Sequence, residues 1–153
     1  MVTDNDVYDE DAVNHGIRPP ALQAIFRRID DWMGQYDLGR TSTTDTYAYY
    51  LPGARQVERA VAAVHYRNGD TPPAVELVVD ADALAQVDLL DEFDAAWAQL
   101  VAATPSAGCS FERRRSGDYR VAFDDVGLPG AVQTLDALAP LMAALRKRKP
   151  RVL

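Results

Sequence analysis

The chain is poor in the side chains that nucleophilic enzymes and zinc sites use. Its 153 residues include one cysteine, Cys109, and two histidines, His15 and His65. A single cysteine cannot form an internal disulfide, which suits a reducing compartment and argues against a small secreted scaffold. The sequence also lacks a Walker loop, a GxGxxG turn, a zinc-type cluster and a nucleophile elbow. This pattern favours binding over catalysis, although carboxylate sites assembled in space leave no local motif.

Long apolar runs are missing as well. No run of about 20 apolar residues is present to span a bilayer, and the N-terminal segment is acidic where a signal peptide is basic and then apolar. With 48% hydrophobic residues the chain can bury a core without disulfides or metal. We therefore expect a cytoplasmic protein that needs no cofactor and no metal. Its expected parts are a mobile acidic tail (1–18), one domain (19–148) and a basic tail (149–153).

Lysine and arginine are absent between Asn68 and Phe111, and the formal net charge of the chain is −7. Such an acidic body repels nucleic acid and anionic membranes, and it steers a basic protein partner toward itself at low salt. The alternative is that these acids only keep the protein soluble. The binding interpretation predicts that the partner contacts come from this stretch, through Glu76, Asp80, Asp82, Asp88, Asp91 and Asp94.

Two of these acids also have a local explanation. Asp88, with Asp91 three residues later, is a variant of a capping box, and acids at a helix N-terminus interact favourably with the helix dipole. A calcium loop from Asp80 to Asp91 is a further alternative. However, Leu84 and Ala85 occupy the positions where an EF-hand needs an oxygen ligand and a glycine. We therefore favour helix capping and solvated surface over a metal site.

The first half of the chain predicts one helix followed by strands. The helix begins at Pro19 and Pro20 and ends near Gly39, because apolar residues recur on one face of it. The Thr- and Tyr-rich run from Thr41 to Leu51 predicts one strand. Residues 56–67 fit either a helix or a strand, and alternation between two turn signals favours the strand.

The second half begins with a near-continuous β-branched run, 74–80, which predicts a central strand. A helix follows over 88–101, and a hairpin over 109–126 turns at Ser116 and Gly117. The last helix contains Pro140, which we expect to kink or divide it. The predicted class is α+β, an antiparallel sheet of about five strands with three or four helices packed on it, in the order α-β-β-β-α-β-β-α.

Candidate chemistry outside the acidic stretch is sparse. A small-molecule site or a weakly marked enzyme would be built on the sheet near Tyr47, Tyr49, His65 and Arg120. His65 by itself is more readily explained as a structural histidine. Three consecutive arginines, 113–115, either neutralise the acidic stretch across the sheet or contact a partner. We favour neutralisation.

Three segments together resemble the YezG-like immunity proteins of bacterial polymorphic toxin systems. They are an aromatic strand (TYAYYL, 46–51), a helix (LLDEFDAAWAQL, 89–100) and a late strand (GDYRVAFDD, 117–125). The resemblance implies an antitoxin that binds a cognate toxin, covers or distorts its active site, and has no catalytic residues of its own. An alternative of the same size, charge and class is a chaperone for a secreted effector.

Overall fold

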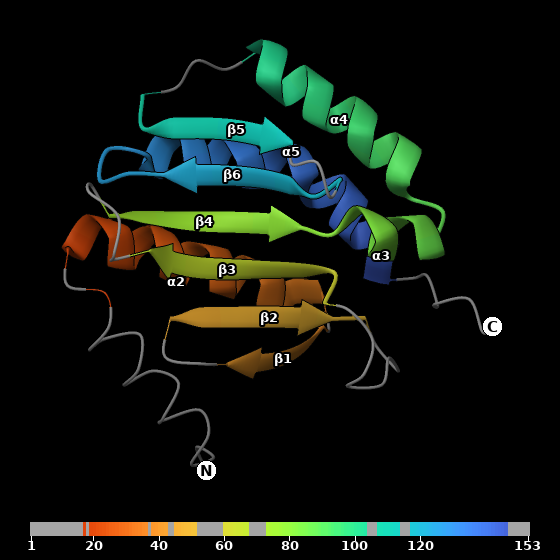
Figure 1. The fold of residues 1–153 in the computed structure, drawn as a ribbon, viewed down its shortest axis with the longest axis horizontal. Coiled ribbons are helices and arrows are strands. Elements are labelled where there is room, and N and C mark those ends of the chain that lie inside the picture. The colour runs from red at the N-terminus through yellow and green to blue at the C-terminus, as the bar shows by residue number, and fades with distance from the viewer. Residues whose placement is uncertain are drawn as a thin grey trace.

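The protein folds as one antiparallel sheet with helices on one of its faces (Figure 1). The computed structural model describes residues 17, 19–36, 38–42, 45–51, 60–67, 73–103, 107–113 and 117–146, with only the backbone at 146. Its elements are α2 (Pro20–Met33), the short 3-10 helix η1 (Gly34–Tyr36), β1 (Gly39–Ser42), β2 (Thr46–Tyr50), β3 (Ala62–Arg67), β4 (Ala74–Val79), α3 (Ala81–Gln86), α4 (Leu90–Ala103), β5 (Cys109–Arg113), β6 (Tyr119–Phe123) and α5 (Leu128–Arg146).

The predicted α+β class is confirmed, with six strands in place of about five. The strand order is β1-β2-β3-β4-β6-β5, and every neighbouring pair is antiparallel. β4 lies between β3 and β6, so its prediction as a central strand is confirmed. The predicted hairpin is the β5–β6 pair, in which Phe111 lies opposite Val121.

The sixth strand comes from the run that was expected to form a single strand. Thr41 lies opposite Ala48, so this run folds back on itself as the β1–β2 pair. Ser, Thr and Asp favour turns because their side chains hydrogen-bond to the nearby backbone, and they occupy the stretch between β1 and β2. The ambiguous run is a strand over 62–67, where Ala62, Val64 and Tyr66 are buried in alternation; residues 56–59 lie outside the described residues.

The helices α2 and α5 cover one face of the sheet (Figure 1). α2 begins with proline at its first position, as expected. Its predicted apolar face is buried against the sheet through Leu22, Ile25, Phe26 and Ile29. The facing side chains of the central strands are buried against it: Val64, Val75, Leu77, Val79, Tyr119, Val121 and Phe123. Ile17, within the segment expected to be a tail, is also buried in this core.

The helix predicted over 88–101 is α4, and a short helix that was not predicted, α3, precedes it. α3 begins after Asp80, whose side chain accepts a hydrogen bond from the Ala83 amide at 3.0 Å. Asp88 has a φ of 59° between α3 and α4, and the Leu89 carbonyl accepts the first hydrogen bond of α4. The residue directly before α4 is therefore Leu89, and Asp88, the predicted cap, lies one residue further back. Asp80 caps α3 through its side chain.

Pro140 does not divide the last helix, because α5 is continuous through it. Proline removes the hydrogen bond to the carbonyl four residues earlier, but Pro140 and Asp136 are both exposed, so water can reach that carbonyl. Residues 128–145 are apolar enough, by length and composition alone, to cross a membrane. This is weak evidence for a span, since Leu135, Leu138 and Met142 are buried inside the protein as in a core helix.

Candidate functional site

Among the predicted partner-binding acids, Glu76 lies furthest from the expected surface position. In β4 its neighbours Val75 and Leu77 face the helices, so Glu76 points to the opposite face, which we call the open face. Its side chain is nevertheless 0% exposed. Glu76 is therefore a buried carboxylate within the sheet and no part of an acidic outer surface.

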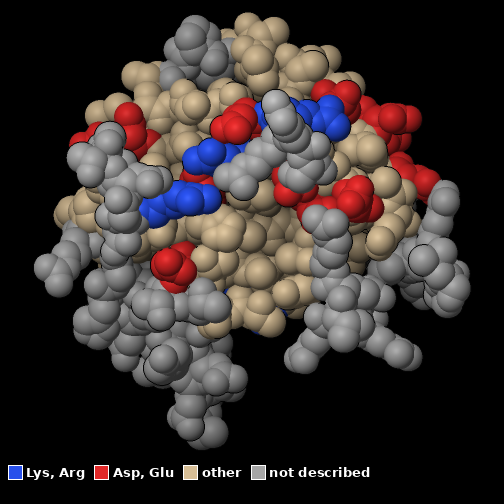
Figure 2. All heavy atoms as spheres, viewed as in Figure 1, with Lys and Arg blue, Asp and Glu red and all other residues tan. Residues whose placement is uncertain are grey.

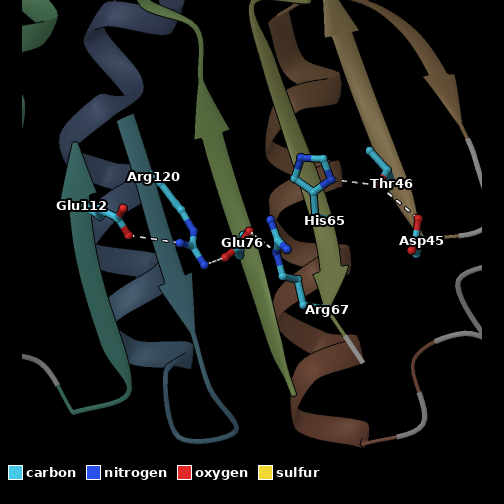
Figure 3. A network of polar contacts seen from close by, with 7 residues as sticks. All are labelled: Asp45, Thr46, His65, Arg67, Glu76, Glu112 and Arg120. Carbon is cyan, nitrogen blue, oxygen red and sulfur yellow. Dashed lines mark hydrogen bonds and ion pairs between the residues drawn. The ribbon is translucent and has the colours of Figure 1, made fainter. Parts of the chain in front are cut away.

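Two arginines from the flanking strands hold this carboxylate (Figure 3). Arg67 of β3 donates from Nε to Oε1 of Glu76 at 2.6 Å, and Arg120 of β6 is ion-paired through Nη2 with Oε2. Arg120 also donates from Nη1 to Glu112 of β5 at 3.0 Å. The result is a line of alternating charge across four strands, Glu112–Arg120–Glu76–Arg67, which we call the charge line. A buried ion is costly unless it is paired, and the charge line meets that requirement.

His65 lies beside the charge line on the same face. Its ring Nδ1 is 2.8 Å from the hydroxyl of Thr46, which also donates to Asp45 at 3.2 Å. In the sheet register His65 stands opposite both Thr46 and Glu76. The contact with Thr46 fixes the orientation of the ring, as expected for a structural histidine.

Asp94 of α4 also serves the fold. It accepts hydrogen bonds from Arg113 of β5 at 2.5 Å and from the Tyr119 hydroxyl at 2.8 Å, while the Arg113 guanidinium lies 4.5 Å from the centre of the Tyr119 ring. Burial and the hydrogen bond to Asp94 raise the pKa of Tyr119 to about 12. Arg113 thus neutralises an acid of the stretch, as favoured from the sequence. Residues 114–116 lie outside the described residues.

The opposite edge of the sheet carries a matching trio that sequence reasoning missed. Asp30 of α2 accepts from Arg40 of β1 at 2.8 Å and from the Tyr49 hydroxyl at 2.7 Å, and Arg40 lies 4.5 Å from the centre of the Tyr47 ring. Burial, with Asp30 nearby, raises the pKa of Tyr49. Each edge strand is therefore tied to a helix by an arginine, an aspartate and a tyrosine. Their spacing along the chain gives no local signal.

Four further acids of the stretch are exposed. They lie on α3, on the connection to α4 and in the first turn of α4, and we call them the α3–α4 acidic surface: Asp82, Asp88, Asp91 and Glu92. Figure 2 shows acidic side chains gathered on the side of the molecule where Figure 1 places these helices. Asp91 and Glu92 also interact favourably with the α4 dipole.

The alternative small-molecule site does not assemble as expected. Tyr47 and Tyr49 are buried toward the helices, whereas His65 and Arg120 lie on the open face. Alternation along each strand separates the two pairs by the thickness of the sheet. Among the residues that the structure describes, no three His, Cys, Asp or Glu side chains form a group that could hold a metal ion.

No protein-family model, curated protein or solved structure matches this chain. The likeness to the YezG-like proteins therefore rests on the three segments alone. The second and third of them meet in the fold, since Phe93 and Trp97 of α4 contact the ring of Tyr119 in β6. The first contains β2, which lies beyond β3 and β4 from β6.

Proposed function

We propose that this chain is a non-enzymatic binding protein of the bacterial cytoplasm. Its proposed role is that of an immunity or antitoxin factor, which inhibits a cognate toxin by covering its active site. The α3–α4 acidic surface supplies the electrostatic part of that interface, and the partner is a protein with a basic face.

The grouping of exposed acids on one side of the molecule carries this proposal. Glu76, Asp80 and Asp94 have partners inside the fold: two arginines, a helix amide, and an arginine with a tyrosine hydroxyl. The α3–α4 acidic surface stays exposed on one side of the molecule. Like charges held close together on a surface raise its potential, and complementary potentials increase association rates between proteins.

Inhibition of this kind needs no chemistry from the chain itself. A basic active site, such as one that binds phosphate groups, attracts the acidic surface and is then covered by it. The helical backbone of α3 and α4 holds Asp82, Asp91 and Glu92 at fixed spacings before contact, which reduces the ordering cost of binding. The toxin is the only catalyst in this scheme.

The test is to purify the chain with its bound partner from the native host and to assay the partner free and in complex. An immunity factor leaves the partner inactive until the two are separated. A partner that is equally active in the complex contradicts inhibition and supports the effector chaperone. A toxin-like C-terminal domain in the captured partner identifies the activity to assay.

A further inference from the structure

The charge line is net neutral, so it does not attract ions of one sign. Read across the strands it alternates: Glu112 negative, Arg120 positive, Glu76 negative, Arg67 positive. Read from the other end, every sign is reversed. A line with this property is complementary to itself when it is turned end for end.

We propose that two copies of this chain pair through the open faces of their sheets, related by a two-fold axis that passes between Glu76 and Arg120. This surface differs from the α3–α4 acidic surface, so the inference goes beyond the proposed function. Isologous pairing of this kind is the commonest symmetry among soluble oligomers.

The exposed ends of the charge line make the intermolecular contacts. The side chains of Arg67 and Glu112 are 41% and 54% exposed, whereas Glu76 is fully buried between them. Arg67 donates to Glu76 through Nε alone, and its two terminal nitrogens make no hydrogen bond with the residues that the structure describes. The two-fold axis sets Arg67 of each copy against Glu112 of the other. Arginine is suited to such contacts because its planar fork can bind a carboxylate with two hydrogen bonds.

The described rest of the open face is partly apolar. Small or flat side chains surround the charge line, all of them half-buried: Ala48, Tyr50, Ala63, Ala74, Val78 and Ala122. Every described helix that packs on a sheet face does so on the other side (Figure 1). Pairing would remove these apolar groups from water, which is the main favourable term in association.

Sheet geometry is compatible with this arrangement. The charge line runs across the strands (Figure 3), so a two-fold axis perpendicular to it runs along them. The two sheets then stack with their strands nearly parallel, the aligned class of sheet packing. Six strands about 4.8 Å apart and five residues long cover on the order of 400 Å² in projection. Because stable interfaces bury about 800 Å² per partner, we expect a weak, concentration-dependent dimer.

Sedimentation velocity on the full chain, over about a hundredfold range of protein concentration, tests this proposal. The wild type is expected to shift from monomer to dimer. Glu112→Arg places a cation against Arg67 of the other copy, so its dimer should be at least about tenfold weaker. Asp136→Arg makes the same charge change on the exposed side of α5, behind the sheet, and should leave the dissociation constant unchanged.

A second variant keeps the test decisive if Glu112→Arg fails to fold. Ala63→Glu adds a carboxylate in the middle of the open face, next to Ala48 and Val78. It should be monomeric throughout. A wild type that stays monomeric at the highest concentration overturns the proposal, as does a folded variant of either kind that dimerises like the wild type. None of these changes touches the α3–α4 acidic surface, so either proposal can fail without the other.

Discussion

The two faces of the sheet are built from the same alternating strands but are held by different forces. On the helix-covered face Val75, Leu77 and Val79 of β4 meet other apolar side chains, and their contribution follows the apolar area buried. On the open face the same strand presents Glu76, which is equally buried but depends on two arginines. One face therefore tolerates changes that conserve volume, whereas the other tolerates only changes that conserve charge balance.

The largest loss in the free energy of unfolding is expected on the helix-covered face. Leu77→Ala removes a fully buried side chain in the central strand and leaves a cavity, so it should lower the free energy of unfolding by about 4 kcal/mol. Urea unfolding followed by circular dichroism measures this loss. Leu77→Met keeps the volume and should lose less than about 1.5 kcal/mol. If the two variants were equally destabilised, packing would not control this face.

The next largest effect is expected one residue earlier, on the open face. Glu76→Ala leaves Arg67 and Arg120 beside an empty site, and because both arginines can partly recover hydration the loss should be about 3 kcal/mol. The matched variant Glu76→Leu/Arg67→Met/Arg120→Met removes the buried carboxylate together with both of its arginines and leaves only the half-exposed Glu112 of the charge line. Replacing a buried ionic group by apolar residues is often neutral, so this variant should unfold within about 1 kcal/mol of the wild type. A triple variant weaker than Glu76→Ala would show that the ion pairs themselves stabilise the fold.

The tyrosine–aspartate hydrogen bonds at the two edges of the sheet differ in how exposed the aspartate is, so they extend the comparison to hydrogen bonds. Tyr49→Phe should lose about 1.5 kcal/mol, because the Asp30 acceptor is only 22% exposed. Tyr119→Phe should lose less, about 1 kcal/mol, since Asp94 is 53% exposed and water can replace the hydroxyl. Thermal unfolding of both variants in one buffer ranks them. The reverse order would contradict the role given to exposure.

The same tyrosines predict how stability changes at alkaline pH. The folded pKa of Tyr119, about 12, lies above the ordinary value of about 10. Its protonated hydroxyl therefore contributes stability that is fully present below about pH 10 and is lost as the pH rises through about 12. The pKa of Tyr49 is raised as well, so its contribution has the same sign. Ultraviolet titration should find both hydroxyls among the last to ionise, and Tyr119→Phe should lose stability less steeply above pH 10.

The smallest effect is expected at the exposed end of the charge line. Glu112→Gln weakens an ion pair with Arg120 at a carboxylate that is 54% exposed, so the free energy of unfolding should fall by no more than about 0.5 kcal/mol. Glu76→Gln removes the same charge from the other side of Arg120 and should cost several times more. Equal losses at the two positions would mean that burial does not separate them.

Local patterns predicted much of the fold. The apolar face of 20–33, the β-branched run of β4 and the apolar alternation of β6 are each encoded within a few residues, and α2, β4 and the β5–β6 pair are confirmed. The errors arose at the ends of elements, which the pattern of apolar residues does not mark. The Thr-rich run contributes to both strands of the β1–β2 pair, and α3 begins at the cap supplied by Asp80.

The candidate site was harder to predict because its contacts join residues that are far apart in the chain. A single acid within the apolar run of β4 signals a buried carboxylate, but its partners come from β3 and β6 and are fixed only by strand register. Asp94 meets Arg113 and Tyr119 from 19 and 25 residues away. Sequence reasoning therefore identified the acidic stretch but could not separate Glu76, Asp80 and Asp94, which the fold uses, from the four acids of the α3–α4 acidic surface.

The most direct test of that separation is the association rate with the partner captured from the host. Asp82→Lys/Asp91→Lys/Glu92→Lys reverses three exposed acids, and Asp31→Lys/Asp125→Lys/Asp136→Lys makes the same change in total charge at exposed sites elsewhere. The first variant should associate at least about tenfold more slowly at low salt, with the difference shrinking as salt is added, and the second should stay close to the wild type. Equal rates for the two variants would contradict an interface on α3 and α4.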